Sequence, residues 1–284
     1  MIARVRAIAK LMLLAVTVAG CAGSPRTPGT IVIASGTDLE GMQPLTTVHS
    51  LSRQVQRYLV FTPLVRLSAT LSPEPWAAIA WRWNDARTIL TFVVDTTLRW
   101  HDGVPVTAAD ARFTIVLAQN AATGYARRGD LAGITEVSAP APDTLSLQFG
   151  APQANVPLVL AELPLVPRHL LQHVAPAALR RHAFTYAPIG SGPYRVVSRE
   201  QGQRWILRRT NAFPARMGGV ASTPTLVFAV IDEATTKVAG LVSGALDIAG
   251  VNPATAPLVR RDRTLRVLDY PTFVTNWLIF NPRC

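Results

Sequence analysis

Short runs of β-forming residues alternate with short stretches of helical periodicity along this chain, and that alternation restricts it to a mixed α/β fold. The clearest strand-like runs are residues 31–34, 89–94 and 145–149. Prolines divide residues 152–176 into pieces too short for a long helix. Because 49% of the 284 residues are hydrophobic, the chain can bury the core of one large or two ordinary globular units.

Capping residues predict where two of the helices begin. Thr107 and Asp110 have the spacing of a capping box, in which a hydroxyl and an acid three residues later bond the free amides of the first turn. Thr46 or Thr47 is placed to cap an earlier helix over residues 48–59, where apolar side chains recur at helical spacing.

The last third of the chain has a different pattern. Residues 194–198 and 204–209 predict a β-hairpin, and residues 225–231 predict another strand. Asp232 is placed to cap the helix that follows, and Gly244 predicts its left-handed end.

The first twenty residues have the layout of a signal peptide. Arg4, Arg6 and Lys10 precede an apolar run over residues 11–19, and no acidic residue interrupts it. A permanent membrane span needs about 20 apolar residues, so this run is too short to be one. We expect residues 1–20 to be removed.

Residues 18–21 read Val-Ala-Gly-Cys, which resembles the bacterial lipobox. Cys21 would then receive diacylglycerol, and residues 21–29, rich in Gly, Pro and Ser, would form a lipidated tether. Acyl chains on Cys21 would hold the mature protein on a membrane surface without spanning it. The alternative is an ordinary signal peptide in which the cysteine occurs by chance.

The second cysteine and the charge distribution argue against a disulfide-held fold and against a nucleic-acid-binding protein. The second cysteine is Cys284, so acylation of Cys21 would leave no internal disulfide, and packing must hold the fold. The net charge is +11, but the arginines occur in scattered pairs without an aromatic-interleaved basic stripe. A solvated basic surface, or attraction to anionic lipid headgroups, explains the charge better than nucleic-acid binding.

Several landmarks, in a fixed order, match a known family. Residues 98–110 read Leu-Arg-Trp-His-Asp-Gly-Val-Pro-Val-Thr-Ala-Ala-Asp and resemble its signature, hydrophobic-x-F-H-D-G-x-P-hydrophobic-T-A-x-D, with Trp100 where an aromatic residue is usual. The other landmarks are residues 75–83, 166–170, 188–194, 211–213, 241–248 and 276–281. On these residues the chain resembles the family 5 extracellular solute-binding proteins, the oligopeptide and dipeptide receptors of bacterial ABC importers.

The resemblance implies an α/β fold of periplasmic-binding-protein-like class II lobes with mixed sheets. Residues 30–46 and 186–284 would form a discontinuous first-lobe domain, and residues 47–185 an inserted α/β subdomain. Family members continue past this point into a second lobe and then return to the first. The resemblance therefore implies a C-terminally truncated chain in which the second ligand-binding lobe is missing, together with the residues that pair with a peptide's terminal charges.

The resemblance also implies the function. It predicts an exported, lipid-anchored, monomeric and non-enzymatic protein of the periplasm or cell surface, without cofactor or metal. Such a protein binds peptides or similar small solutes and delivers them to an ABC permease by closure about a hinge. The candidate ligand-binding residues follow the first strand or lie in the last landmark: Ser35, Gly36, Thr37, Asp38, Asn276 and Trp277. Two alternatives stay open, a structural or partner-binding lipoprotein without a ligand and an envelope hydrolase.

Other patterns favour plain structural interpretations. His101, Asp102 and Gly103 are typical of a turn supported by a side-chain hydrogen bond, because no nucleophile with an orienting group is apparent nearby. His169 and His173 lack the glutamate and the third ligand of a zinc site. The sequence around Ser191 predicts a rigid turn rather than a nucleophile elbow. The tryptophans of the first half are expected mainly to fill the core: Trp76, Trp81 and Trp83.

Overall fold

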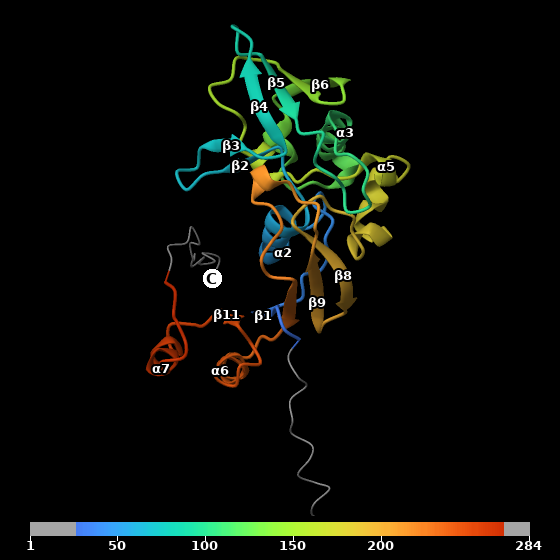
Figure 1. Ribbon diagram of the computed structural model, residues 1–284. Helices are drawn as coiled ribbons and strands as arrows, with labels where there is room; N and C mark the ends of the chain where they lie inside the picture. The colour runs from blue at the N-terminus through green and yellow to red at the C-terminus, as the bar shows by residue number, and fades with distance from the viewer. Residues whose placement is uncertain (1–26, 270–284) are drawn as a thin grey trace, which may run out of the picture. The chain divides into compact units, whose positions relative to one another are not determined.

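A five-stranded mixed sheet combines the first strand of the chain with strands from its last third (Figure 1). The computed structural model describes residues 27–269, of which residues 31–269 belong to one compact unit. Strand β1 runs parallel to β11, whereas β10, β9 and β8 form an antiparallel ribbon. In sheet order the strands are β11 (Ile248–Ala249), β1 (Thr30–Ser35), β10 (Thr225–Val230), β9 (Arg204–Arg209) and β8 (Tyr194–Glu200). The mixed α/β class predicted from the sequence is confirmed.

The β8–β9 hairpin and β10 share one apolar face. Trp205 and Leu207 of β9 are buried. They pair with Phe228 and Leu226 of β10, which are buried as well. Gly202 lies in the hairpin turn with φ of 69°, a conformation that L side chains rarely adopt. Both strands of the predicted hairpin, and the third strand, are confirmed.

A second, antiparallel sheet forms from residues 78–149. Its order is β4 (Ala78–Trp83), β5 (Ile89–Val94), β7 (Thr144–Phe149) and β6 (Ile134–Ala141). Alternate residues of β5 and β7 are buried, as expected for strands with one face on a core. A separate two-stranded ribbon pairs β2 (Val65–Leu67) with β3 (Pro73–Pro75).

Helix α3 (Ala108–Gln119) contacts β6 and β7 of this sheet. Its predicted capping box is confirmed: Asp110 Oδ2 accepts a hydrogen bond from Thr107 N at 2.9 Å. Asp110 Oδ1 accepts from Arg168 N at 2.9 Å, which ties the start of the helix at Arg168–Leu171 to α3. One buried carboxylate therefore serves two helix beginnings.

The remaining helical segments are short. They are α2 (Ser50–Val55), which continues as a π-helical turn (Gln56–Val60), α4 (Val159–Glu162), α5 (Arg168–Leu171), α6 (Ala234–Val242) and α7 (Ala256–Arg261). Single 3₁₀ turns occupy Ala121–Thr123, Arg128–Leu131, Pro176–Arg181, Ala183–Thr185 and Ala215–Met217. Among the described residues, no helix is long and apolar enough to cross a membrane.

The predicted cap of the first helix is wrong. The amides of Thr46 and Thr47 both bond Gln43 O, so these residues belong to the preceding turn. His49 caps α2 instead, because its Nδ1 accepts from Ser52 N at 3.3 Å. Val48 consequently lies before the helix, with 60% of its surface exposed.

The predicted cap of α6 is displaced by one residue. Glu233, not Asp232, is the capping residue, since its carboxylate accepts from Thr235 N at 2.8 Å and from Thr236 N at 2.5 Å. A glutamate side chain is long enough to reach both amides from this position. Gly244 ends the helix with φ of 74°, as predicted.

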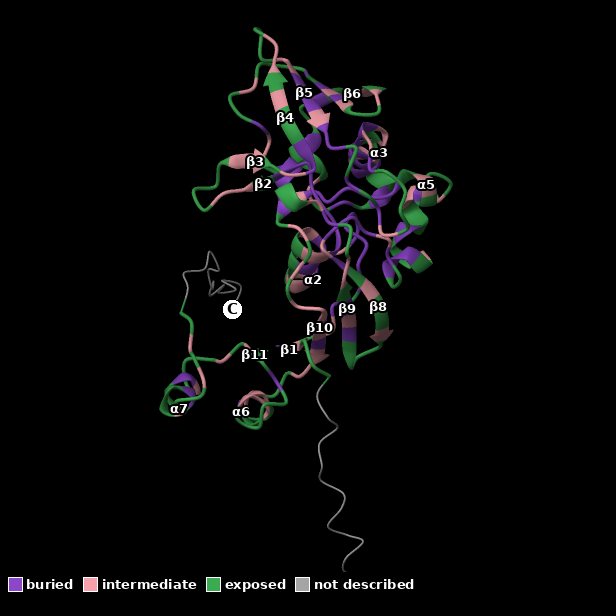
Figure 2. Ribbon diagram, in the orientation of Figure 1, coloured by how far each residue is buried: buried purple, intermediate pink, exposed green. Residues whose placement is uncertain are grey.

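One contiguous hydrophobic core runs through the elements between residues 39 and 228. Its largest fully buried side chains include Trp100, Trp205, Phe61 and Phe92. In Figure 2 the buried residues gather where α3 and the strands around it meet, and the exposed ones lie on the outer loops.

Gly190 and Gly192 let two backbone segments approach each other closely. A Cβ at Gly190 would lie 1.8 Å from Val60 O, and a Cβ at Gly192 would lie 2.4 Å from Leu59 O. Gly192 N donates to Val60 O at 2.9 Å. Neither glycine has a positive φ, so close approach, rather than backbone freedom, requires glycine at both positions.

Gly190→Ala and Gly192→Ala should each lower the free energy of unfolding by about 3 kcal/mol or more, because backbone cannot yield as a flexible side chain can. Gly129→Ala is the matched control, since no atom lies within 4 Å of the added Cβ. It should leave stability unchanged or slightly raised. Urea denaturation followed by circular dichroism measures all three, and equal stability of the three variants would refute the close contact.

Candidate ligand-binding site

The loop that follows β1 carries four of the candidate residues, and Ser35 is the first. Its side chain is buried, and its hydroxyl donates to Ala229 O at 3.2 Å. Ser35 O accepts from Ile231 N at 2.9 Å, so β1 and β10 end at the same edge of the sheet. The Ser35 hydroxyl is thus directed into the sheet rather than toward a ligand.

Gly36 and Thr37 are the accessible part of this loop. A Cβ at Gly36 would lie 3.4 Å from Asp232 Oδ1 and 3.8 Å from Lys237 Nζ, so a negative and a positive group both lie close to this glycine. The exposed Thr37 places its hydroxyl 2.8 Å from Nε2 of His49. The loop therefore reaches the beginning of α2, which His49 caps.

Asp38 is held in the β8–β9 hairpin by three donors. Its carboxylate accepts from Trp205 Nε1 at 2.6 Å and from Gly202 N at 2.9 Å, and Arg199 lies 3.3 Å away. Burial opposes ionisation of Asp38, yet these hydrogen bonds and the Arg199 charge together hold its pKa below the usual value. Asp38 thus fixes the loop to the sheet as an ionised carboxylate.

The accessible groups at this edge include two of the expected residues, Gly36 and Thr37, and two that were not expected. Asn276 and Trp277 lie outside the described residues. Asp232 and Lys237 were not among the sequence candidates. The sequence predicted Asp232 as a helix cap, a role that Glu233 takes in the structure. No pattern in the sequence indicates that Lys237, one helical turn later, lies near Gly36.

His101 joins the signature segment to the glycine turn. Its Nδ1 accepts from Gly190 N at 3.1 Å, so the proton resides on Nε2, which donates to Gly192 O at 3.0 Å. The His101 amide also donates to Gly190 O at 2.7 Å. Burial lowers the pKa of His101 to about 4, because the enclosed ring is less stable when charged.

The other residues that suggest catalysis have structural partners. Ser191 is buried, and its hydroxyl lies 2.7 Å from that of Thr62. Asp102 Oδ1 accepts from Val104 N at 3.2 Å, which confirms the predicted turn, and Oδ2 lies 2.7 Å from His169 Nε2. No nucleophile and base face each other in this arrangement.

The three tryptophans of the first half are half-buried and pack on the core. Each is paired with a phenylalanine at a centroid distance of 5.4–6.1 Å: Trp76 with Phe213, Trp81 with Phe92 and Trp83 with Phe149. These tilted pairs support the prediction that the indoles mainly complete the core.

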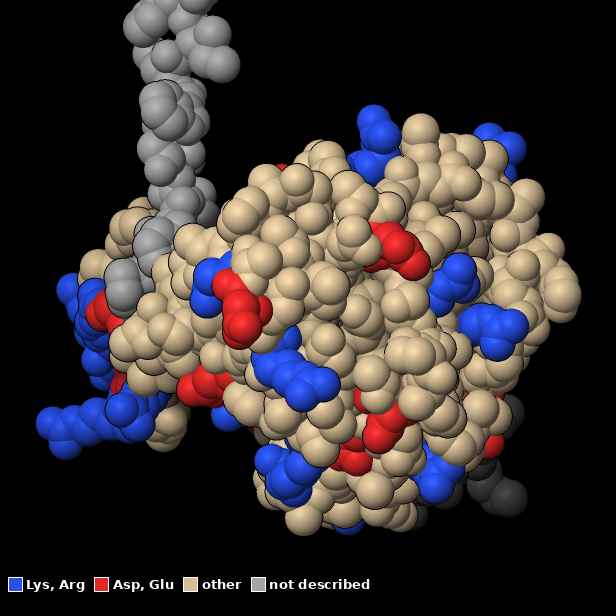
Figure 3. Space-filling view, turned by 90° about the horizontal axis from the view of Figure 1, so that it is seen from above, with Lys and Arg blue, Asp and Glu red and all other residues tan. Residues whose placement is uncertain are grey.

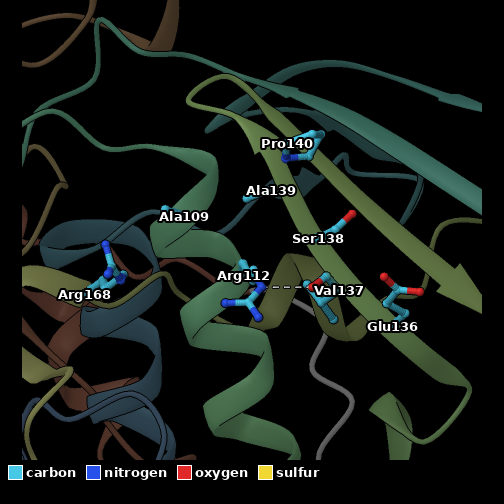
Figure 4. Close-up of a pocket in the computed structure, with 8 residues that line it drawn as sticks. All are labelled: Ala109, Arg112, Glu136, Val137, Ser138, Ala139, Pro140 and Arg168. Carbon is cyan, nitrogen blue, oxygen red and sulfur yellow. Dashed lines mark hydrogen bonds between the residues drawn. The ribbon is translucent and has the colours of Figure 1, made fainter.

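A hollow of about 400 Å³ lies between α3 and β6 (Figure 4). Arg112 crosses it and donates from Nε to Val137 O at 3.0 Å, while Arg168 lies at its border. None of the candidate residues within residues 27–269 lines it. On the face shown in Figure 3, basic and acidic side chains are interspersed and form no continuous basic patch.

Residues 72–283 match the family described as "Bacterial extracellular solute-binding proteins, family 5 Middle". Among curated proteins, a putative ABC transporter peptide-binding protein of Brucella ovis is 28% identical over 184 residues. That alignment covers 64% of this chain and 34% of the relative.

Two solved structures are similar to the fold. The oligopeptide-binding protein AppA of Bacillus subtilis, in complex with a nonapeptide, has a TM-score of 0.75 at 20% identity. NikZ of Campylobacter jejuni, in complex with Ni(L-His), has a TM-score of 0.74 at 22% identity. The matches cover 81% and 84% of this chain but only 45% and 46% of those proteins, so the chain spans less than half their length.

His101 should make stability depend on pH. The fold favours the neutral ring, so its contribution is complete above the unfolded pKa of 6.5 and is lost as the pH falls through 6.5 toward 4. Replacing His101 by Asn removes this titration. The loss of unfolding free energy between pH 7 and pH 4 should therefore be smaller by about 2 kcal/mol in the variant.

Urea denaturation at a series of pH values measures this difference. His173→Asn changes an exposed histidine and should retain the pH profile of the unchanged protein. An identical profile for His101→Asn would show that the ring is not held neutral.

Proposed function

The chain belongs to the bacterial extracellular solute-binding proteins of family 5, which are non-enzymatic, and on that premise we propose that it forms one half of a receptor that binds peptides or similar small solutes for an ABC importer. Family membership removes the envelope hydrolase from consideration. The observation that best supports the proposal is the accessible loop at Gly36 and Thr37, which lies at the carboxyl ends of β1 and β10. In open α/β sheets, ligands bind at this edge.

Two charges beside the loop suit a zwitterionic solute. Asp232 is exposed, and no hydrogen bond of its side chain is recorded within residues 27–269. It can pair with the ammonium group of a peptide, and Lys237 can pair with a carboxylate. Both groups lie close to Gly36, on the side where a side chain would otherwise stand.

A second lobe that closes over this loop would strengthen the binding of a solute held there. We assign residues 30–46 and 186–284 to the first lobe and residues 47–185 to an inserted subdomain. Peptides suit such a cleft because their backbone groups can be bonded regardless of side chain. Solutes of other chemistry fit the same arrangement, and NikZ, a structural relative, was solved with Ni(L-His).

We also propose that the protein is exported, monomeric and anchored through lipid on Cys21, and that it delivers its solute to a permease. Cys21 and the signal segment lie outside the described residues, so this part rests on the sequence pattern alone. Residues 21–29 have the Gly-, Pro- and Ser-rich composition of a tether between a folded body and a membrane anchor.

Isothermal titration with trialanine tests the receptor function. The full chain should bind saturably, and Asp232→Asn should weaken binding about tenfold by removing the charge opposite the ammonium group. N-acetyl-trialanine lacks that ammonium group, so the unchanged protein and Asp232→Asn should bind it equally. Asp85→Asn, an exposed aspartate in a turn, is the control and should match the unchanged protein.

Two results would count against this proposal. Absence of saturable binding to either peptide would remove the receptor function from this chain. Equal loss of affinity for both peptides in Asp232→Asn would show that Asp232 does not face the ammonium group.

Cys21→Ser should abolish incorporation of radioactive palmitate when the gene is expressed in a bacterium with a lipoprotein pathway. Cys284→Ser, which changes the other cysteine, should leave incorporation unchanged. Labelling that survives Cys21→Ser would refute the lipid anchor.

A further inference from the structure

A groove lies along α2 and its π-helical continuation and reaches the β2–β3 ribbon. It consists of two adjoining hollows, of about 210 Å³ and about 450 Å³, and Arg57 lines both. We call these two hollows the α2 groove. The larger one alone falls in the size range of small-ligand pockets.

The larger hollow has aromatic walls with cations against them. The Arg57 guanidinium lies 4.6 Å from the ring centroid of Tyr58, and that of Arg66 lies 4.8 Å from Trp76. Tyr58 is 58% exposed, so its ring is open to a bound group. This hollow can therefore take an apolar or aromatic group.

The smaller hollow has more guanidinium groups than carboxylates. Glu162 is shared by Arg53 at 3.4 Å, by Arg57 at 3.6 Å and by Arg127. One carboxylate has too few oxygens to satisfy the fork of donors that each guanidinium presents. Ser50 and Gln54 add further polar groups to the same walls.

In the larger hollow, Arg66 is paired with Glu74 at 3.0 Å. The α2 groove is therefore lined by three arginines and only two carboxylates, and both carboxylates are already paired. The arginines are Arg53, Arg57 and Arg66, and the carboxylates are those of Glu74 and Glu162. A further anionic group would complement this charge, whereas a cation would be repelled.

The α2 groove begins beside the loop at the carboxyl end of β1. Thr37 contacts His49, and His49 caps α2 immediately before Ser50, which lines the smaller hollow. His49 therefore joins the loop to the start of the groove. The groove and the loop form neighbouring parts of one surface.

We propose that the α2 groove is an acidic subsite of the receptor: it binds a side-chain carboxylate of the solute between Arg53 and Arg57, and a neighbouring aromatic side chain against Tyr58 and Trp76. This inference rests on the proposed solute-binding function. It makes the preferred solute a small acidic peptide with an aromatic residue, because the two hollows accept side chains of that size and charge.

Titration calorimetry with Ala-Glu-Tyr and Ala-Gln-Tyr tests the subsite, since the two peptides differ only in one side-chain charge. The full chain should bind Ala-Glu-Tyr about tenfold more tightly. Arg53→Gln combined with Arg57→Gln should abolish this preference, so that the variant binds the two peptides with equal affinity. Arg204→Gln removes an exposed arginine that pairs with Glu200 on the β8–β9 hairpin, and should retain the preference.

Glu162→Gln provides a test in the opposite direction. It frees the arginines of their shared carboxylate while keeping a hydrogen-bond acceptor, so the preference for Ala-Glu-Tyr should rise about threefold. Thermal melting would establish that each variant is folded.

The outcomes separate the two proposals. Equal binding of both peptides by the unchanged protein, or a preference that survives the double substitution, would overturn the acidic subsite and leave the receptor function standing. Failure of both peptides to bind would overturn both.

Discussion

The contact between the backbone at residues 190–192 and the π-helical turn at Leu59–Val60 is the constraint on which the rest of the arrangement depends. The close approach is possible because Gly190 and Gly192 have no side chains. Three hydrogen bonds between His101 and the two glycines hold these glycines in place. The signature segment and the glycine turn are far apart in the sequence, yet they act as one unit. Their shared geometry fixes where α2 lies and, through His49, where the loop after β1 meets it.

The sequence predicted the elements whose causes are local. Each of three predicted elements depends on residues only a few positions apart. They are the capping box at Thr107 and Asp110, the alternating strand at Thr144–Phe149 and the hairpin whose turn contains Gly202. The helix caps were predicted less well. His49 is an unusual capping residue, and Glu233 competes with its neighbour Asp232 for the same amides, so propensity alone could not decide either case.

The candidate site was predicted only in part, because the fold decides which side chains remain accessible. Nothing local indicates that Asp38 would be bound by Trp205 or that Ser35 would bond Ala229. The convergence of arginines on Glu162 likewise joins segments more than 30 residues apart. Family resemblance indicated the loop, and three-dimensional contacts leave Gly36 and Thr37 accessible within it.

Amide hydrogen exchange, with and without Ala-Glu-Tyr, tests most directly whether this surface holds a solute. The account predicts slower exchange at residues 36–37, 50–57 and 232–237 when the peptide is present, and unchanged exchange in the hollow between α3 and β6. No slowing anywhere, or slowing confined to residues 109–112 and 136–140, would contradict the assignment of the ligand to the loop after β1 and the α2 groove.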